Sequence, residues 1–411
     1  MKNKKDILFL CQYFYPEYVS SATLPFDTAV ALSKAGFTVG ALCGYPKEYN
    51  LTDKVPLKET HENIAIRRLK YIQLKRSNIL GRLINYFSFT FSAALHFREL
   101  RKYKSVIVYS NPPILPLIAM FADKFFNTKV VFVSYDIYPE VAHVTNNISE
   151  NSLISKMMKF VNKIVFKHVT KVIALSNEMK AYLLNHRLAL SGQQIEVISN
   201  WYEDKGLSDA ANLSNNELFG SIKADGNIVV SYFGNLGICQ DLDTILSAIR
   251  KLKEDNKIKF LFAGHGSKME TLRQIIIKEE LQNVTVFNFL HGQDFQDALN
   301  ISDCFLVSLA EGVTGLAVPS KTYSYMMAGK PVIAIMGEDS DIVRDLEENN
   351  AGFAMQVGES SKLVSVIKDL CDNEDKRKIM GKNCRNVFLE KYTKEYCTQK
   401  YVKMMKRILG G

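Results

Sequence analysis

The segment Gly315-Leu-Ala-Val-Pro-Ser-Lys-Thr-Tyr-Ser-Tyr-Met-Met-Ala-Gly-Lys-Pro-Val-Ile-Ala334 contains the signals for one helix and for the strand that follows it. Ser320 is a residue type that commonly caps helix N-termini, so we expect a helix over Ser320–Ala328. Gly329 is expected to end this helix, because glycine readily adopts the left-handed conformation found there. The apolar, β-branched run Val332–Ile335 is then expected to form a strand.

Lys321 lies in the first turn of this expected helix, where a positive charge opposes the helix macrodipole. The cation is favourable there if a bound diphosphate supplies negative charge. The alternative is a helix start that binds nothing.

Elsewhere in the chain, short apolar runs also alternate with segments of helical period. The runs expected as strands are Ile7–Cys11, Val106–Ser110, Val130–Ser134, Val172–Leu175, Glu196–Ser199, Ile228–Phe233, Lys259–Ala263, Val284–Phe287 and Cys304–Ser308. The further segments expected as helices are Thr23–Ala35, Asp241–Lys253 and Lys268–Glu280. This alternation predicts an α/β fold with two doubly wound parallel sheets. The polar stretch 203–226 is the expected linker, with a boundary near residue 205.

Two glycine turns follow expected strands in the second half, at Phe233-Gly234-Asn235-Leu236-Gly237 and Ala263-Gly264-His265-Gly266-Ser267. Glycine lets backbone N–H groups approach a ligand without an intervening Cβ, although tight turns also use glycine for steric reasons alone. Ligands of doubly wound sheets bind at the carboxyl ends of the strands, so we expect these turns to meet Lys321 at one nucleotide-sized site.

In the first half, Val133-Ser-Tyr-Asp-Ile-Tyr-Pro-Glu140 places two carboxylates just after a strand. Asp136 is a candidate to orient an acceptor hydroxyl or take its proton, and Glu140 is a candidate to assist. The alternative is a turn cap and a surface charge. The first strand runs into Gln12-Tyr-Phe-Tyr-Pro-Glu17, which is not G-x-G-x-x-G, and this disfavours a dinucleotide-dependent dehydrogenase.

Composition narrows the class of protein. The chain has 411 residues, of which 47% are hydrophobic and 23% charged, and this is ordinary for a globular protein. The seven cysteines are scattered and never spaced C-x-x-C, so reduced cytosolic thiols are expected rather than a disulfide framework or a zinc ribbon. No signal peptide is expected at the N-terminus. No transmembrane helix is expected either, because the uncharged stretch Leu83–Phe97 is short and Ser105–Ala122 is interrupted by prolines.

Charge divides the chain into unlike halves. Residues 1–200 hold 26 Lys and Arg against 14 Asp and Glu, whereas residues 201–411 hold 26 against 29. The positive charge has two explanations: a solvated surface, or the binding of an anionic membrane or phosphorylated acceptor. Nucleic acid is disfavoured because no recognised motif accompanies the charge. Around the apolar stretch Leu83–Phe97, the basic residues are Arg67, Arg68, Lys70, Lys75, Arg76, Arg82, Arg98, Arg101, Lys102 and Lys104. A further set, Lys156, Lys159, Lys163 and Lys167, is spaced for one helix face.

These motifs resemble glycosyltransferase family 4, and most closely its O-antigen, capsule and colanic-acid branch, which includes L-fucosamine transferases. The residues that carry the resemblance are Gly234-Asn-Leu-Gly237 with Gln240, Ala263-Gly-His-Gly266, Pro319-Ser-Lys321, Ala328-Gly-Lys-Pro331, Tyr15-Pro-Glu17, Gly36-Phe-Thr-Val39, Asn111-Pro-Pro113, Asp136-Ile-Tyr-Pro-Glu140 and Ser199-Asn-Trp201. The likeness spans nearly the whole chain.

The resemblance implies a GT-B fold, in which two Rossmann-like domains face a cleft. Residues 1–205 would bind the acceptor, residues 206–385 would bind the nucleotide sugar, and residues 386–411 would form a helix that packs back on the first domain. It implies retaining transfer from a nucleotide sugar, which is expected to be UDP-linked, without an obligatory metal. The acceptor would be a polyprenyl-diphosphate-linked glycan for bacterial surface polysaccharide. The enzyme would be cytoplasmic and peripherally attached to the inner face of the cell membrane.

The resemblance also assigns residues. Donor binding would use Gly234, Asn235, Gly264, Gly266, Glu311, Ser320, Lys321 and Ser324, and the acceptor-side loop would be Tyr15, Pro16, Glu17, Ser20 and Ser21. Two glutamates common in the family are replaced by Leu316 and Ser324, so Glu311 is expected to reach the sugar and Ser324 to hydrogen-bond the ribose weakly. The family's N-terminal glycine pair is replaced by Ser20-Ser21. Two other functions are carried as alternatives: a nucleotide-sugar 2-epimerase on the same fold, and a non-catalytic subunit that binds nucleotide or glycan.

Overall fold

The computed structural model describes residues 4–46, 55–74, 79–207, 218–220, 222–223 and 227–410. The chain divides into two compact units. The first unit comprises residues 1–200, 316–318 and 394–411, and the second comprises residues 201–315 and 319–393. Much of the expected linker, together with Lys75 and Arg76, lies outside the described residues.

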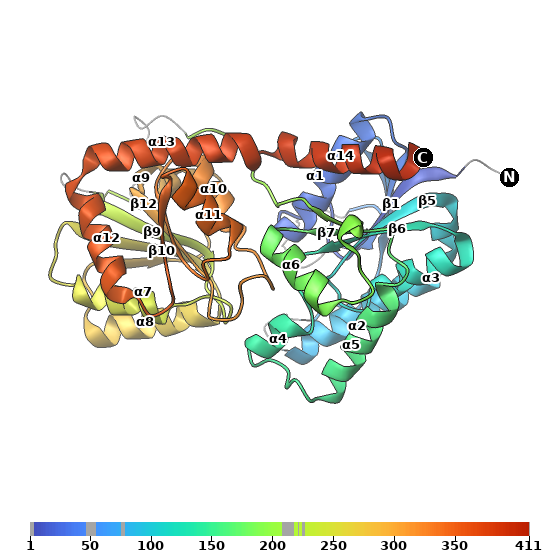
Figure 1. Cartoon of the computed structure of the whole chain (residues 1–411), viewed down its shortest axis with the longest axis horizontal. Coiled ribbons are helices and arrows are strands. Elements are labelled where there is room, and N and C mark those ends of the chain that lie inside the picture. Colours follow the sequence, from blue (N-terminus) through green and yellow to red (C-terminus); the bar gives the residue numbers. More distant parts are fainter. Residues whose placement is uncertain are drawn as a thin grey trace. The chain divides into compact units, whose positions relative to one another are not determined.

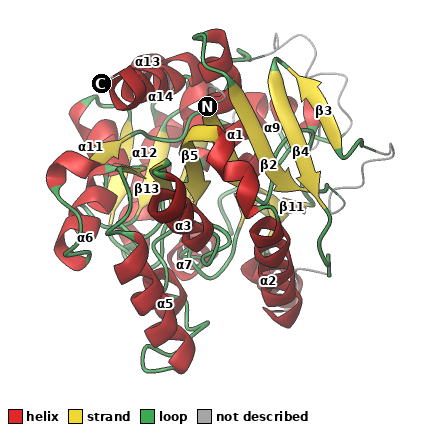
Figure 2. Cartoon of the chain, turned by 90° about the vertical axis from the view of Figure 1, so that its right-hand side faces the viewer, coloured by secondary structure: helices red, strands yellow, loops and turns green. Residues whose placement is uncertain are grey.

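The first unit is built on an eight-stranded sheet in the order β3-β4-β2-β1-β5-β6-β7-β8. Its strands are β1 (Lys5–Cys11), β2 (Val39–Gly44), β3 (Lys58–His61), β4 (Ile64–Leu69), β5 (Tyr103–Tyr109), β6 (Lys129–Ser134), β7 (Lys171–Ala174) and β8 (Ile195–Val197). Every pairing is parallel except that of β3 with β4 at one edge, where Figure 2 shows β2, β4 and β3 side by side. Consecutive residues of β1 from Ile7 to Leu10 are buried, because helices cover both faces of the sheet.

The helices of the first unit form two layers around this sheet. They are α1 (Ser20–Lys34), α2 (Ile79–Leu95), η1 (Phe97–Lys102), α3 (Pro116–Phe126), α4 (Glu140–Val144), α5 (Leu153–Val165), α6 (Asn177–His186), η2 (Gly192–Gln194) and α14 (Lys394–Gly410). Helix α14 packs against α1, whereas α2, α3 and α5 lie together on the other side of the sheet (Figure 1). The Ser152 and Ser176 hydroxyls cap α5 and α6 by accepting a backbone N–H.

The C-terminal helix α14 is tied to the first unit by charged contacts as well as by packing. Lys394 lies 3.4 Å from an Asp27 carboxylate oxygen, and Arg407 donates to Glu196 at 2.8 Å. Between them, Tyr401 is buried. Helix α14 therefore belongs structurally with the first unit, although it begins 194 positions after Asn200, where the main segment of that unit ends.

The second unit has a six-stranded, entirely parallel sheet in the order β11-β10-β9-β12-β13-β14. Its strands are β9 (Ile228–Asn235), β10 (Ile258–His265), β11 (Val284–Phe287), β12 (Cys304–Ser308), β13 (Val332–Ile335) and β14 (Gly352–Met355). Its helices are α7 (Asp243–Lys251), α8 (Ser267–Glu279), α9 (Gly292–Ile301), α10 (Lys321–Met327), α11 (Asp341–Glu348), α12 (Ser360–Asp372) and α13 (Glu374–Lys391). A core of buried aliphatic and aromatic side chains runs from β9 and β10 to α7 and α12.

The predicted α/β class with two doubly wound sheets is confirmed, and each expected strand and helix is present with small shifts at its ends. Strands β2, β3, β4 and β14 were not predicted. Within the part of the chain that the structure describes, no helix is both long and apolar enough to cross a bilayer.

Two of the basic residues that the sequence offers for membrane contact are engaged inside the first unit instead. Arg68 on β4 is only 3% exposed, and its guanidinium pairs with Glu59 on β3 and donates to the Pro56 and Tyr15 carbonyls at 2.7 and 2.9 Å. Arg67 pairs with Glu99 at 2.8 Å. Arg68 is therefore not available as a surface cation, because it is buried and holds neighbouring segments in place, whereas the Arg67 side chain is still one-third exposed.

Replacing Arg68 by Gln is expected to lower the free energy of unfolding by about 2–4 kcal/mol, because it leaves a carboxylate and two carbonyls without their donor. Arg98→Gln, at an exposed position, is the matched control and should change stability by less than about 0.5 kcal/mol. Urea denaturation measures both. Equal effects of the two substitutions would show that the Arg68 contacts add nothing to stability.

Candidate active site

The topology of each sheet marks one place where a ligand is expected. In the second unit the chain runs from β9 outward through β10 and β11, and then returns to the opposite side of β9 with β12. In the first unit the same reversal occurs between β1 and β5. Ligands of open α/β sheets bind outside the carboxyl ends of the strands at such a reversal. Residues after β9 and β12, and after β1 and β5, are therefore the first candidates.

The glycines after β9 and β10 are required by the packing of the two turns against each other. Gly264 pairs with Gly234 in the parallel register, and a Cβ on Gly264 would lie 2.0 Å from the Gly234 carbonyl oxygen. A Cβ on Gly266 would lie 2.3 Å from the Leu236 carbonyl oxygen. All three glycines have a φ between +109° and +144°, which side-chain-bearing residues rarely adopt. Close approach of the turns thus explains the two glycine motifs that the sequence analysis identified.

Lys321 extends its side chain across the turn that follows β9. A Cβ on Gly234 would lie 2.6 Å from Lys321 Cε, so the missing side chain at 234 makes room for the lysine. The ammonium donates to the Asn235 carbonyl and, at 3.1 Å, to the Tyr232 hydroxyl, and it lies 4.8 Å from the centre of the Tyr232 ring. Desolvation lowers the pKa of this amine to about 7. Glycine and lysine therefore act together to place a poorly solvated cation at the switch point.

Three further side chains beside this turn were not predicted as site residues. His265 pairs with Asn235 in the register, and burial together with the nearby charge of Lys321 lowers its pKa. Its ring lies 5.7 Å from that of Phe289, and the Phe289 ring lies 4.5 Å from that of His291. Phe289 is half exposed. The position of His265 within the Ala263–Gly266 motif was the available signal, whereas Phe289 and His291 follow β11 without any motif.

The remaining donor-side candidates are placed less favourably for ligand contact. Ser320 is the residue before α10, but its side chain makes no capping hydrogen bond, so the predicted serine cap is absent. Instead, the Thr322 hydroxyl donates to the Pro319 carbonyl at 2.8 Å. Ser324 is buried, and its hydroxyl donates to the Lys321 carbonyl at 2.7 Å within the same helix. Glu311 is exposed in the loop after β12.

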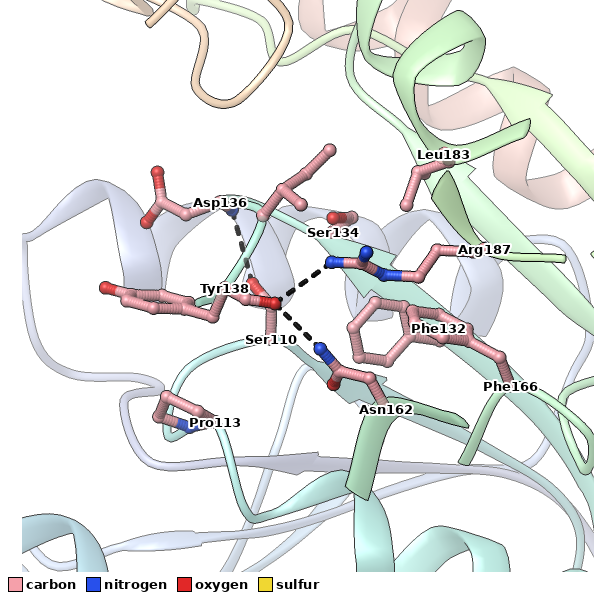
Figure 3. Close-up of a pocket in the computed structure, with 11 residues that line it drawn as sticks. Ser110, Pro113, Phe132, Ser134, Asp136, Tyr138, Asn162, Phe166, Leu183 and Arg187 are labelled. Carbon is pink, nitrogen blue, oxygen red and sulfur yellow. Dashed lines mark hydrogen bonds between the residues drawn. The ribbon is translucent and has the colours of Figure 1, made fainter. Parts of the chain in front are cut away.

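In the first unit, a pocket opens at the carboxyl ends of β5 and β6. It is lined by Ser110, Pro113, Phe132, Ser134, Asp136, Ile137, Tyr138, Asn162, Phe166, Leu183 and Arg187 (Figure 3). The Ser110 hydroxyl accepts hydrogen bonds from the backbone N–H groups of Tyr135 and Asp136, at 3.0 and 3.3 Å, and so fixes the turn after β6. Desolvation raises the pKa of Asp136 to about 6. At neutral pH, Asp136 is therefore an ionised carboxylate that accepts a proton more readily than an exposed one.

Glu140, the other carboxylate of this motif, is held by an arginine that the sequence analysis did not single out. Arg187 makes a two-pronged ion pair with it, at 2.6 and 2.9 Å, and also donates to the Tyr138 carbonyl at 3.2 Å. The Asn162 amide donates to the same carbonyl at 2.7 Å. In Figure 3 the Asp136 carboxyl group points away from Arg187. Asp136 is thus the carboxylate left available, and Glu140 supports the loop.

The end of β1 carries a buried amide without a partner. Gln12 is 1% exposed, and neither atom of its amide group forms a hydrogen bond within the described structure. Just after the neighbouring strand β5, the Asn111 side-chain oxygen is likewise buried without a partner. Buried polar groups are normally paired, so these two groups at the switch point of the first unit fit a site that receives a polar ligand.

The acceptor-side loop is fixed mainly by aromatic stacking. Tyr15 stacks on His61 with ring centres 4.0 Å apart, and Tyr15-Pro16 is a cis peptide. Glu17 is buried, and helix α1 begins at Ser20, three residues before its expected start at Thr23. This loop follows β1 directly, beside the end of the sheet where Gln12 lies.

Metal ligands are not clustered in the described ranges, where no three His, Cys, Asp or Glu side chains gather as a metal site. Asp241 and Asp243 instead mark the start of α7, where an Asp241 carboxylate oxygen accepts from the Asp243 and Thr244 N–H groups at 3.1 and 3.3 Å. Asp241 therefore caps the start of this helix.

Comparison with known proteins connects both units to one enzyme class. The family described as Glycosyl transferases group 1 matches residues 214–387. The probable glycosyltransferase WbjE of Pseudomonas aeruginosa is 24% identical over 328 residues, which is 79% of each chain. The putative colanic acid biosynthesis glycosyl transferase WcaI of Escherichia coli K12 is 23% identical over 163 residues, or 39% of each chain. The crystal structure of Anabaena HepE in complex with UDP-glucose superposes with a TM-score of 0.72 at 16% identity, over 98% of this chain and all of that one.

Proposed function

From the premise that this chain belongs to the glycosyl transferases group 1 family and is a glycosyltransferase with a GT-B fold, we propose its substrates and the residues that handle them. The donor is a UDP-linked sugar bound by the second unit. The acceptor is a lipid-linked glycan of bacterial surface polysaccharide, bound by the first unit. Transfer retains the anomeric configuration and needs no obligatory metal. The enzyme works in the cytoplasm at the inner face of the cell membrane.

The proposal depends most on the state of Lys321. Its amine is largely removed from water, has a pKa of about 7, and makes no ion pair with any carboxylate of the described residues. An ammonium in such a place gains from an anionic partner, because charge-assisted hydrogen bonds are strong where water is scarce. The diphosphate of a nucleotide sugar supplies that partner. As the diphosphate leaves with negative charge, Lys321 stabilises it in place of a metal ion.

The nucleoside end of the donor is assigned to the ring cluster beside this lysine. Phe289 is half exposed and borders His265 and His291, so it offers an aromatic face on which a base can stack. HepE, which shares the fold, was crystallised with UDP-glucose. Uracil is therefore the base that we assign. Because Ser324 is buried and donates within α10, we assign ribose recognition to the exposed Asn235 side chain rather than to Ser324.

The acceptor side is assigned to the pocket of the first unit. Asp136 accepts the proton of the acceptor hydroxyl while the hydroxyl oxygen attacks the anomeric carbon on the face from which the diphosphate leaves. The bond from that carbon to the diphosphate breaks in the same step, so the configuration is retained. The unpaired amide group of Gln12 and the unpaired side-chain oxygen of Asn111 are suited to bind sugar hydroxyls. A polysaccharide acceptor is supported by the likeness to WcaI, whose name assigns it to colanic acid biosynthesis.

UDP affinity should depend on the protonation of Lys321. The amine is charged below about pH 7, so affinity should be greatest between that pH and the last phosphate ionisation of UDP; above about pH 7, affinity should fall by up to tenfold per pH unit. UDP itself keeps its charge between pH 7 and 9, because its last phosphate ionisation lies near 6. Calorimetric titration in the presence of EDTA measures this and also tests whether binding needs a metal.

Two lysine variants separate charge from shape in this experiment. Lys321→Arg keeps a permanent charge and should remove the pH dependence, whereas Lys321→Met should weaken binding by about 1.5–3 kcal/mol. Lys382→Met, at an exposed position on α13, is the control and should bind as the parent does. Unchanged affinity of Lys321→Met would exclude the phosphate role.

Asp136 should control the chemical step without affecting UDP binding. Asp136→Asn should lower kcat by about 100-fold or more, because the amide cannot take a proton. In the parent, kcat should fall as the pH drops through about 6, where this carboxylate becomes protonated. Sugar transfer to isolated lipid-linked glycan measures both. Glu140→Gln should mainly lower thermal stability, because it breaks the pair with Arg187; a larger loss of kcat in Glu140→Gln than in Asp136→Asn would reverse the two roles.

A further inference from the structure

Exposed large hydrophobic side chains are concentrated on three helices of the first unit. Of the 25 such residues in the described structure, eleven lie on α2, α3 and α5. They are Leu80, Leu83, Phe87, Phe91 and Leu95 on α2, Phe121 and Phe125 on α3, and Leu153, Ile154, Met157 and Phe160 on α5. We call these eleven residues the apolar face. Single exposed hydrophobics are normal on proteins, but a contiguous set of this kind marks an interaction surface.

Helix α2 shows that this exposure is not a by-product of core packing. The core-facing side repeats every four residues, with Asn85, Phe89 and Ala93 all at most 2% exposed. The outward side repeats at the same interval, and Phe87 and Phe91 on it are 51% and 67% exposed. An ordinary surface helix carries polar residues on its outward side. Helix α2 is apolar on both sides, and it contains no acidic residue.

Helix α5 adds positive charge to an equally apolar side. Leu153 and Phe160 are 82% and 63% exposed. Lys156, Lys159 and Lys163 are exposed on the same helix, which contains no acidic residue. Large apolar side chains on one side and lysines on the other are the signature of helices that lie in a membrane interface.

The three helices form one continuous surface. Phe97, which follows α2, lies with its ring 6.3 Å from that of Phe125, and the Phe125 ring lies 6.2 Å from that of Phe121. Helix α3 in turn packs against α5. Figures 1 and 2 show α2, α3 and α5 on the same side of the sheet of the first unit. The apolar face therefore extends from Phe87 and Phe91 on α2 to the side of α5 that borders its lysines.

We propose that the apolar face is a docking surface for an anionic lipid bilayer, with the side chains of α2 and α5 inserted at the headgroup level and the α5 lysines on lipid phosphates. The identification of the bilayer rests on the proposed function, because a lipid-linked acceptor is reached there. Charge complementarity favours lipid over a second copy of the chain, since a two-fold contact would bring the same lysines together. The surface shares the apolar stretch Leu83–Phe97 with the one expected from sequence, but the buried Arg68 takes no part in it.

Vesicle flotation with the full chain tests the proposal. The parent should bind phosphatidylcholine vesicles that contain phosphatidylglycerol at least about tenfold more tightly than vesicles of phosphatidylcholine alone. This preference should disappear at high salt, which screens the lysines. In a Phe91→Trp variant, the new indole should shift its fluorescence to shorter wavelength on anionic vesicles, whereas the native Trp201 is 7% exposed in the second unit and should not respond.

Matched variants separate insertion from charge. Phe87→Ser with Phe91→Ser should lower vesicle binding by about tenfold or more, as each apolar group removed weakens insertion. Lys156→Gln, Lys159→Gln and Lys163→Gln together should remove only the preference for anionic lipid. The controls are Ile277→Ser, which removes a 79% exposed hydrophobic residue from α8, and the triple variant Lys278→Gln, Lys368→Gln and Lys382→Gln, which removes equal charge from the second unit.

The same samples give the results that would overturn the proposal. One such result is that the parent does not bind anionic vesicles at low salt. Another is that the variants and their controls lose vesicle binding equally. A third is that light scattering shows a dimer, which the double substitution Phe87→Ser with Phe91→Ser dissociates. UDP affinity should be unchanged in every variant, which also shows that each is folded. Failure of UDP to bind the parent would count against the proposed function and leave the vesicle result as a separate measurement.

Discussion

The ammonium of Lys321, held where water reaches it poorly, is the feature on which the organisation of the second unit depends. In the folded protein the pKa of the Lys321 amine is about 7, whereas the pKa of an unperturbed lysine is 10.5. The free energy of unfolding should therefore rise with pH between these values, which means that the charged lysine costs stability at neutral pH. A group that lowers stability in the empty protein is explained by a ligand that offsets the cost. In the proposed function that ligand is the donor diphosphate.

This placement of the lysine requires the glycines around it. Gly234 leaves the space that the Lys321 side chain occupies, and Gly264 lets the turn after β10 approach the turn after β9 to within contact of its backbone. The parallel register then sets His265 beside Asn235. A side chain at either glycine would force the turns apart and displace the carbonyl that holds the ammonium. Backbone packing and the placement of the Lys321 ammonium thus both require glycine at positions 234 and 264.

Much of this arrangement was predictable from sequence, because buried parallel strands are continuous apolar runs. Two of the strands that escaped prediction lack this pattern: β3 is the polar edge strand Lys58–His61, and β4 carries Arg67 and Arg68. Strand β2 is a buried apolar run that was missed although it has the pattern. The burial of Arg68 depends on Glu59 and on two distant carbonyls, and no local pattern reveals such partners. In the same way, Glu140 looked like a catalytic carboxylate because its partner, Arg187, lies 47 residues further along the chain. Lys321 was identified because a cation at the start of a helix is locally unfavourable, and this conflict is visible in the sequence.

The measurement that tests the central claim most directly is the titration of the Lys321 amine itself, followed by NMR in protein labelled with ¹⁵N at the lysine side chains and assigned with Lys321→Arg. In the free protein its pKa should be about 7. With saturating UDP the pKa should rise by at least about one unit, since the diphosphate stabilises the charged form. A pKa near 10.5 in the free protein, or a value that UDP leaves unchanged, would contradict the account.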